Sequence, residues 1–553
     1  MAGLAPSSVA FHDNKQVNEA SHVSSGEKSD TSTLTSDVDS AYDWMEPSVF
    51  DDEKLASLYA PPDTWESAHR FDPKAKWTKE EDRAVLRKLD YRIFSVACLL
   101  FFSLQLIRHN IGNALSDGFL KDIGVTTNDY NLAQTLFYCS FLVAELPSQL
   151  VSKWLGVDVW VPIEIICWSI IAMSQAAITS KAGFYLTRIL LGLFMGGFIP
   201  DMILFLSYSY TSSELAWRLS WFWVTLTVTN IISNLLAAGI LQMRGIQGLA
   251  GWQWLFIIQG ALTLVIGVFA AFWLPPSPTQ TASRFRGRNG WFTAREEIII
   301  TTRVLRDDPS KSSMHNRQRL TVRDFVKSLS DFDHWPLYLI GLVAFIPVGT
   351  VNAYFTLILR SLGYSTFHTN LLLIPGAVVF IFNNVITSWA SRRFNERTIF
   401  ASLGSWWILF FLIALVAIPG DTNKWVKYAL LSLITAWPYP HPILVSWNSR
   451  NSGSVRTRTV SAAVYNMFVQ AAQIVASNIY REDDKPEYKR GNRILLGLAS
   501  ASIVLYAFTK VYYTARNSYK SRKWESLTAD ERAHYLATTT DEGNKRLDFK
   551  LAH

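Results

Sequence analysis

Long apolar stretches separated by short polar loops dominate this chain. Twelve of them reach the roughly 20 mostly apolar residues that a helix needs to cross the hydrocarbon core of a bilayer. Only 18% of the residues are charged, too few for the surfaces of several soluble domains. The sequence therefore predicts an all-α polytopic membrane protein. We expect spans at 92–114, 131–152, 160–179, 183–206, 218–241, 253–274, 336–359, 369–389, 399–418, 426–447, 458–479 and 493–513.

A long basic segment divides the spans into six and six. Residues 1–66 contain thirteen acids against three lysines and few large apolar side chains, so they cannot bury enough surface to fold. Residues 76–90 are expected to form a short amphipathic helix with Thr78 as its N-cap. The predicted order is an acidic disordered tail and pre-membrane helix (1–90), an N-terminal six-helix bundle (91–274), a basic central loop (275–334), a C-terminal six-helix bundle (335–514) and a C-terminal tail (515–553).

Basic residues mark one side of the predicted spans. The central loop and the loop with Arg392, Arg393 and Arg397 lie on that side, whereas the opposite loops carry few cations in excess of acids. The positive-inside rule then places the central loop and both termini in the cytosol. Because the basic excess lies in short loops between spans, it indicates a lipid bilayer rather than a nucleic acid as the partner.

Four charged residues lie inside the predicted spans: Arg108, Glu145, Arg188 and Asp201. Each costs at least about 2.5–3.5 kcal/mol near the bilayer centre, so each needs a partner, a cavity or a function. At about 1.5 Å per residue, the two arginines reach similar depth in the outer half and the two acids lie in the inner half. An arginine fork binds carboxylate, sulfonate or phosphate, and a titratable acid can carry a proton.

Structural roles for these four residues stay open beside the functional ones. Arg188 could donate only to backbone carbonyls, and Glu145 could serve the kink at Pro147. Asp201 could lie near enough to the cytosolic boundary to be solvated. Arg108 is followed by polar residues, which favours contact with a ligand.

Further polar residues in the spans are candidates for a substrate pocket. Asn110 follows Arg108, Asn352 lies in span seven, and Asn466 and Gln470 share one helical face of span eleven. The sequence contains no phosphate-binding glycine-rich motif, no metal-ligand spacing and no nucleophile motif. We therefore expect neither an enzyme nor a cofactor or metal, and we expect a monomer.

Several segments resemble known transporter motifs. Span four, RILLGLFMGGFIP at 188–200, resembles the arginine-and-glycine motif of the major facilitator superfamily. RHNIGNA at 108–114, GWQWLFIIQG at 251–260 and SVRTRTVSAAVYNMF at 454–468 are similar to the fungal anion:cation symporters, which include allantoate, nicotinate, pantothenate and biotin permeases. The resemblance runs from about residue 70 to the end and implies the major facilitator fold, two bundles around a central cavity.

Within that group, FDPKAKWTKEED at 71–82 and FIPDMILFLSYSYT at 198–211 are most similar to the fungal sulfonate and inorganic-sulfur transporters. This branch implies proton-coupled uptake of a small organic anion, such as a sulfonate or sulfate ester, at the plasma membrane. The expected roles are anion binding at Arg108, Asn110, Arg188, Asn352, Asn466 and Gln470, proton coupling at Glu145 and Asp201, and close helix packing at Gly192, Gly196 and Gly197.

Two departures from the family pattern keep other functions open. The family usually has an acid just before the span-one arginine and another three residues after the first span-four glycine, where this chain has Ile107 and Met195. Either proton coupling has moved to other acids or the protein is not a proton symporter. A carboxylate or vitamin permease, a metabolite exporter and a nutrient sensor that binds but hardly moves its ligand are the alternatives.

Overall fold

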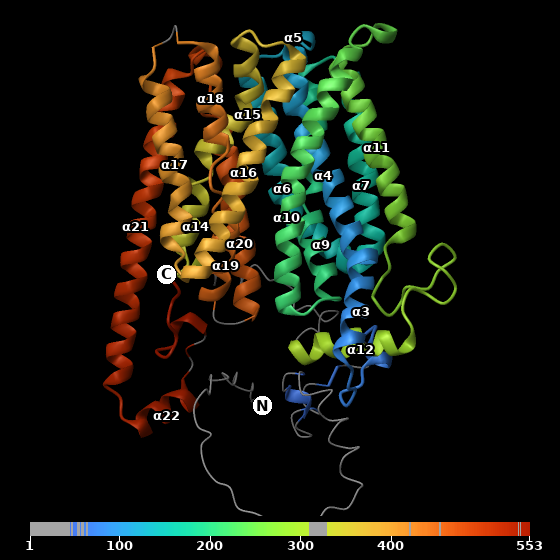
Figure 1. The fold of residues 1–553 in the computed structure, drawn as a ribbon, viewed down its shortest axis with the longest axis vertical. Helices are drawn as coiled ribbons and strands as arrows, with labels where there is room; N and C mark the ends of the chain where they lie inside the picture. Colours follow the sequence, from blue (N-terminus) through green and yellow to red (C-terminus); the bar gives the residue numbers. More distant parts are fainter. Residues whose placement is uncertain are drawn as a thin grey trace, which may run out of the picture.

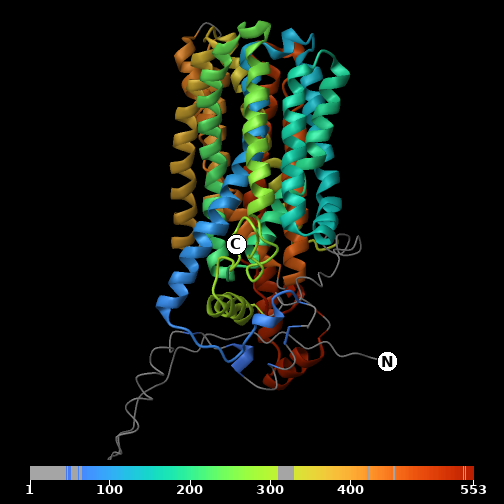
Figure 2. The same ribbon diagram turned by 90° about the vertical axis from the view of Figure 1, so that its right-hand side faces the viewer.

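The computed structural model describes residues 45, 48–51, 56, 60–61, 65–308, 329–419, 422–452, 455–539, 541 and 543–553. These residues form long helices that stand side by side, as Figures 1 and 2 show, and they contain no strand beyond one isolated bridge at Ser283 and Gly287. Most of the predicted acidic tail (1–66) and part of the central loop (309–328) lie outside the described residues.

The first six predicted spans are all helical. The first span is one continuous helix. It consists of α3 (Lys79–Leu89), a π-helical turn (Asp90–Phe94) and α4 (Ser95–Ala114), which follow one another without a break. Thr78 caps α3 through a capping box with Glu81, which confirms the predicted start of the pre-membrane helix. The next helices are α6 (Thr127–Leu155), α7 (Val157–Ser174), α8 (Lys181–Met195), α9 (Phe198–Ser207), α10 (Ser212–Ile240) and α11 (Gly251–Trp273).

The second six spans are helical as well. They comprise α14 (Trp335–Val343), α15 (Ile346–Ser361), α16 (Thr366–Phe394), α17 (Thr398–Ala417), α18 (Lys424–Thr435), α19 (His441–Asn451), α20 (Val455–Ala476) and α21 (Lys489–Glu525). Nine helices in the described part of the chain are long and apolar enough to cross a membrane. The all-helical fold predicted from the sequence is thereby confirmed.

Three of the predicted spans are broken. Span four divides at Gly196 and Gly197, span seven at 344–345, and span ten at 436–440. Proline lacks the backbone N–H that an α-helix needs, and Pro347, Pro438 and Pro440 lie at or next to two of these breaks. Helix α21 also continues to Glu525, well past the predicted end of span twelve, so the segment expected as a tail begins as helix.

The two halves of the chain form separate helix groups that meet along a shared interface. In the N-terminal half, α6 packs on α8, and α7 packs on α11; in the C-terminal half, α17 packs on α21, and α14 packs on α20. Across the interface, α10 packs on α16, and α6 packs on α20. This arrangement places α4, α6 and α10 of one half opposite helices of the other half.

Helix α12 (Ala294–Asp307) and α22 (Ala529–Thr538) lie at one end of the molecule, which we call the inner end after its expected orientation. Figure 1 shows α12 running across the long helices, and in Figure 2 it is seen end-on. Ion pairs hold α12 to the first span, with Lys88 Nζ 2.6 Å from Glu296 and Arg303 3.2 Å from Asp82. The predicted central loop therefore contains a docked helix.

The opposite end, the outer end, joins the two halves through polar contacts. Asn131 of α6 donates to the Tyr480 carbonyl oxygen (2.9 Å) and accepts from the Tyr354 hydroxyl. The Thr127 backbone N–H, in the first turn of α6, donates to the Glu482 carboxylate at 2.8 Å. Because these contacts join residues more than 220 positions apart, they hold the outer ends of the two halves together.

Candidate substrate site

Arg188 is buried in the centre of the N-terminal half. It lies on α8, whose start is capped by the Ser180 hydroxyl, and only 2% of its surface is exposed. Its Nη2 donates to Gln134 Oε1 at 2.6 Å, and its guanidinium carbon lies 4.5 Å from the centre of the Phe137 ring. Its Nε, however, has no hydrogen-bond partner among the described residues. A donor that is buried and unused is available to a ligand.

Arg108 approaches the same ring from α4. Its guanidinium carbon lies 5.8 Å from the centre of Phe137 and 5.1 Å from that of Phe141, both on α6. Its side chain is half-buried, and the structure gives it no ion pair or hydrogen bond among the described residues. Cation–π contacts of this kind contribute about 0.5–2 kcal/mol each.

The structure thus brings together the two arginines that the sequence placed at similar depth. Phe137 holds both through its ring, and the charges of Arg108 and Arg188 act on each other. Neither guanidinium forms an ion pair with a carboxylate of the described chain. Two like charges in a site of low polarity repel each other, and an anion placed between them relieves that repulsion.

Aromatic side chains from both halves surround this arginine pair. The phenol groups of Tyr138 and Tyr439 lie within electrostatic range of Arg108, and Tyr439 belongs to the C-terminal half. The centre of the His441 ring lies 5.6 Å from that of the Trp223 ring, which belongs to the other half. His441 Nδ1 also shares a hydrogen bond with the Tyr465 hydroxyl at 3.2 Å. The C-terminal half therefore contributes at least one aromatic ring, that of Tyr439, close to Arg108.

The three predicted packing glycines lie where α8 and α9 cross α6. A methyl group added at Gly196 would come within 2.5 Å of the Phe141 carbonyl oxygen, and one at Gly192 would overlap the backbone of Phe137. At Gly197 an added methyl group would meet Ser148. Only glycine permits this approach, so these positions set the distance between α8 and the ring that holds the arginines.

The predicted polar pocket residues occupy different environments. Asn110 is fully buried, and both polar atoms of its amide lack hydrogen-bond partners within the described chain. Asn352 on α15 is exposed, and Asn466 and Gln470 on α20 are half-buried. Helices α15 and α20 pack together, so these three side chains belong to one region of the C-terminal half. Within the described residues, none of the three contacts either arginine.

The predicted acids also differ from each other. Glu145 on α6 is half-buried and makes no ion pair or hydrogen bond with the described residues. Asp201 on α9 is 1% exposed, and its charge acts on that of a second buried acid, Glu164 on α7. Asp201 is therefore not a solvated residue at the membrane boundary, which removes one structural alternative.

The sequence comparisons agree with this architecture. The profile of the Major Facilitator Superfamily matches residues 94–477. The chain belongs to this superfamily. The chain is 46% identical over 526 residues to the "Uncharacterized transporter YIL166C" of Saccharomyces cerevisiae, covering 94% of this chain and 96% of that protein. It is 27% identical to the "Major facilitator-type transporter hxnP" of Emericella nidulans, over 75% of this chain and 84% of that protein.

Solved structures of major facilitator proteins share the fold at low sequence identity. A bacterial homologue of the human lysosomal transporter Spinster, in an inward-facing and unoccupied conformation, aligns with a TM-score of 0.58 at 13% identity, covering 78% of this chain and 97% of that one. The xylose transporter XylE from E. coli aligns with a TM-score of 0.55 at 14% identity, covering 75% of this chain and 96% of that one. This chain is accordingly a membrane transporter of the major facilitator kind.

Sequence reasoning missed several residues of this transporter's centre. Gln134 and Phe137 position the arginines, Tyr439 faces them from the other half, and Glu164 forms part of a buried acid pair. Glu164 could have been found, because it is an acid inside the predicted third span. The other three are ordinary residues of membrane helices, and only the fold reveals their contacts.

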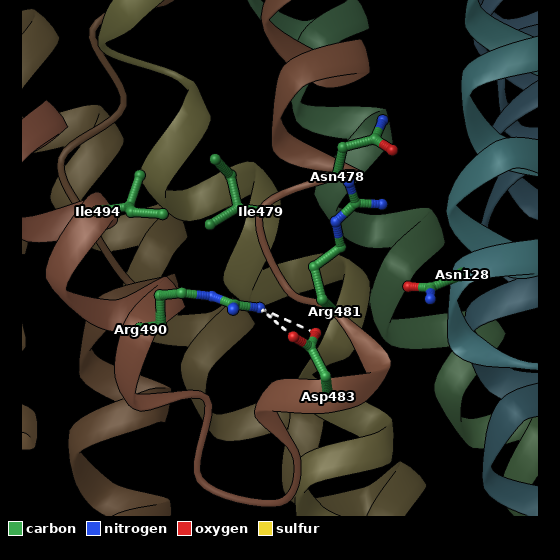
Figure 3. Close-up of a pocket in the computed structure, with 7 residues that line it drawn as sticks. All are labelled: Asn128, Asn478, Ile479, Arg481, Asp483, Arg490 and Ile494. Atoms are coloured by element: carbon green, nitrogen blue, oxygen red, sulfur yellow. Dashed lines mark hydrogen bonds and ion pairs between the residues drawn. The ribbon is translucent and has the colours of Figure 1, made fainter.

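A separate pocket of about 600 Å³ lies at the outer end. Figure 3 shows the side chains that line it. It is lined by Asn128, Asn478, Ile479, Arg481, Asp483, Arg490 and Ile494. Asn128 comes from the N-terminal half and the other residues from the C-terminal half, so the pocket spans the interface between the two halves. Of its two arginines, Arg490 is paired with Asp483 at 2.8 Å. The pocket belongs to the closed outer contact rather than to the arginine pair.

Proposed function

We propose that this transporter takes up a small organic anion, of the sulfonate or sulfate ester class, together with protons across the plasma membrane. The observation that carries the proposal is the arrangement of Arg108 and Arg188 around Phe137 with no ion-paired carboxylate among the described residues. A sulfonate oxygen can accept hydrogen bonds from planar guanidinium groups, which favours an anionic substrate over a neutral or cationic one.

The roles of the remaining residues follow from their positions. Arg108 and Arg188 hold the anion, Asn110 supports them, and Asn352, Asn466 and Gln470 shape the side of the pocket that the C-terminal half provides. Asp201 and Glu145 carry the proton. The basic residues around α12 support an orientation with this end in the cytosol. We infer that the transporter works as a monomer, since both halves of the site belong to one chain.

The test is radiolabel uptake in a fungal strain that lacks its own sulfur-anion carriers, with isethionate, taurine, sulfate, nicotinate and allantoate offered at pH 4.5 and 7. We expect uptake of sulfonates, favoured at acid pH. Uptake of only a carboxylate would overturn the sulfonate assignment but would leave the proposal of an anionic substrate in place. Uptake of none of these compounds would overturn import and favour an exporter or a sensor.

The contribution of the arginine pair is tested in the same strain. Arg108→Ala and Arg188→Ala should abolish uptake while the protein stays at the membrane. Arg360→Ala removes an exposed arginine that donates to the Tyr364 carbonyl oxygen at the outer end, away from Phe137, and it serves as the matched control. Uptake at the level of the unchanged protein in either of the first two variants would remove that arginine from the binding role.

A further inference from the structure

A line of buried hydrogen bonds leads from Arg188 toward the outer end of α6. The Arg188 Nη2 donates to Gln134 Oε1 at 2.6 Å, and the Gln134 Nε2 donates to the Tyr130 hydroxyl at 3.0 Å. The exposed fractions of these three side chains are 2%, 8% and 1%. Gln134 follows Tyr130 by one turn of α6, so its amide lies between the guanidinium and the phenol. Because the three groups are buried, water cannot replace a lost partner at low cost.

Tyr130 is where this line meets the C-terminal half. Its ring packs edge-on against the ring of Tyr354 on α15, with the ring centres 6.0 Å apart and the planes at 87°, which is a favourable geometry for an aromatic pair. Tyr354 is fully buried, and its hydroxyl donates to Asn131, the residue after Tyr130. Asn131 donates in turn to the Tyr480 carbonyl oxygen at 2.9 Å. The Tyr130 ring therefore packs against one of the side chains that close the outer end.

The unused donor of Arg188 lies on the same edge of its guanidinium as the group that holds Gln134. Nε and Nη2 together form an edge that can bind two oxygens of one oxyanion. Arg218 of the same half uses this edge, with its Nε 2.5 Å and its Nη2 2.8 Å from the two carboxylate oxygens of Asp90. At Arg188, Nε has no partner among the described residues, whereas Nη2 donates to Gln134. An oxyanion that binds this edge draws Nη2 toward itself and away from Gln134.

We propose that Gln134 and Tyr130 couple binding of the anion at Arg188 to opening of the outer end. The inference rests on the proposed function and adds two positioning residues to it. As long as Arg188 donates to Gln134, the Gln134 amide fixes the Tyr130 hydroxyl, and the Tyr130 ring stays edge-on to Tyr354. An oxyanion on Arg188 releases Gln134, so the ring can turn and the closed outer contact loses part of its stabilisation. Such coupling is reciprocal, so opening of the outer end raises the affinity of Arg188 for the anion.

The first experiment needs no substrate. In the full-length protein the three native cysteines are replaced by serine, and Ser477→Cys is introduced in the outer contact, where Ser477 is 4% exposed. In intact cells, the rate at which a membrane-impermeant thiol reagent labels this protein, which we call the parent, reports opening of the outer end. We expect Tyr130→Phe, which keeps the ring and removes the hydroxyl, to accelerate labelling about threefold or more. Tyr506→Phe is the matched control and should label like the parent, because the buried Tyr506 hydroxyl has no hydrogen-bond partner among the described residues.

A double-mutant cycle tests whether the effect passes along the line from Arg188. Arg188→Met removes the donor to Gln134, and Gln134→Leu removes the amide, so each should accelerate labelling by itself. The two together should add nothing, because either one already breaks the line. Gln259→Leu removes a buried amide of α11 that has no hydrogen-bond partner in the described part of the chain, and its effect should multiply with that of Arg188→Met. Labelling of Tyr130→Phe at the parent rate would overturn the proposal, and so would effects of Arg188→Met and Gln134→Leu that multiply.

A second experiment adds isethionate and separates this proposal from the assignment of the substrate. We expect isethionate to accelerate labelling of the parent several-fold. It should not change the labelling of Gln134→Leu or Tyr130→Phe, although both variants still bind radiolabelled isethionate. Equal acceleration in the parent and in these two variants would overturn the coupling. If isethionate neither binds the parent nor changes its labelling, while the double-mutant cycle gives the expected result, the substrate assignment fails and the coupling stands.

Discussion

Arg108 on α4 and Arg188 on α8, two different spans of the N-terminal half, contact one aromatic ring, that of Phe137. Both guanidinium groups pack against this ring, so the Phe137 side chain brings a charge from α4 and a charge from α8 to the same place. Because Phe137 is on α6, the distance between α6 and α8 determines where the Arg188 fork points. Under the proposed function, packing of the helices and binding of the anion are therefore linked through a single side chain.

Conservative replacement of the arginines tests the value of the planar fork. Lysine keeps the charge but has a single ammonium group that cannot make two parallel hydrogen bonds. We expect Arg188→Lys to raise the KM for isethionate by about tenfold or more, since hydrogen bonds to charged groups contribute about 1.5–3 kcal/mol. Arg360→Lys is the control and should leave KM unchanged. An equal KM in both variants would show that charge alone suffices at position 188.

The glycines of span four provide a test of helix packing. Gly192→Ala forces a methyl group into the Phe137 backbone, and overpacking of this kind costs about 1–3 kcal/mol. We expect a lower melting temperature and reduced uptake. Gly239→Ala on α10 is the matched control, because an added methyl group there has no atom within 4 Å. Similar melting temperatures for the two variants would contradict close packing of α8 on α6.

The sequence allowed the all-helical fold and the start of α3 at Thr78 to be predicted, because apolar length and capping residues are local properties. The breaks at 196–197 and 344–345 were not predicted, since a proline or glycine in an apolar run does not by itself tell a kink from a break. The contacts of Phe137, Tyr439 and Glu164 depend on which helices are neighbours. No local sequence pattern specifies which helices are neighbours.

The outer contact between the halves should respond to acid. Burial alone would raise the pKa of Glu482, but hydrogen bonds from Thr127 and Lys485 outweigh it, and the pKa is lowered. A lowered pKa means that the contact is fully formed above the ordinary glutamate value of about 4.3 and is lost as pH falls through the lower value of the closed state. We expect the outer end to open more readily in strong acid.

This response is measured with a cysteine at Ser477, which is buried in the outer contact at 4% exposure, after Cys98, Cys139 and Cys167 are replaced by serine. Labelling by a membrane-impermeant thiol reagent reports opening. Glu482→Gln should accelerate labelling several-fold at pH 7 and remove the difference between pH 7 and pH 3.5. Labelling that stays slow at pH 7 in Glu482→Gln would show that the Thr127 contact does not hold the outer end closed.

The inner end offers a test of the docked helix α12. Arg303 has a side chain that is 4% exposed and reaches Asp82 and Glu214, both at 3.2 Å, as well as the Ser209 carbonyl oxygen at 3.0 Å. It thus ties α12 to the first span and to α10. Arg303→Met keeps most of the apolar volume but leaves two acids facing each other without a cation.

Breaking a fully buried ion pair costs about 3–5 kcal/mol. The two acids here are about one-fifth exposed, with side-chain exposures of 19% and 20%, so we expect a smaller loss of about 1–3 kcal/mol. The measurement is the melting temperature of the purified protein in detergent. Arg288→Met removes the same charge from an exposed position of the same segment and should melt like the wild type. Equal melting of Arg303→Met and Arg288→Met would mean that α12 rests on the bundle without being held by Arg303.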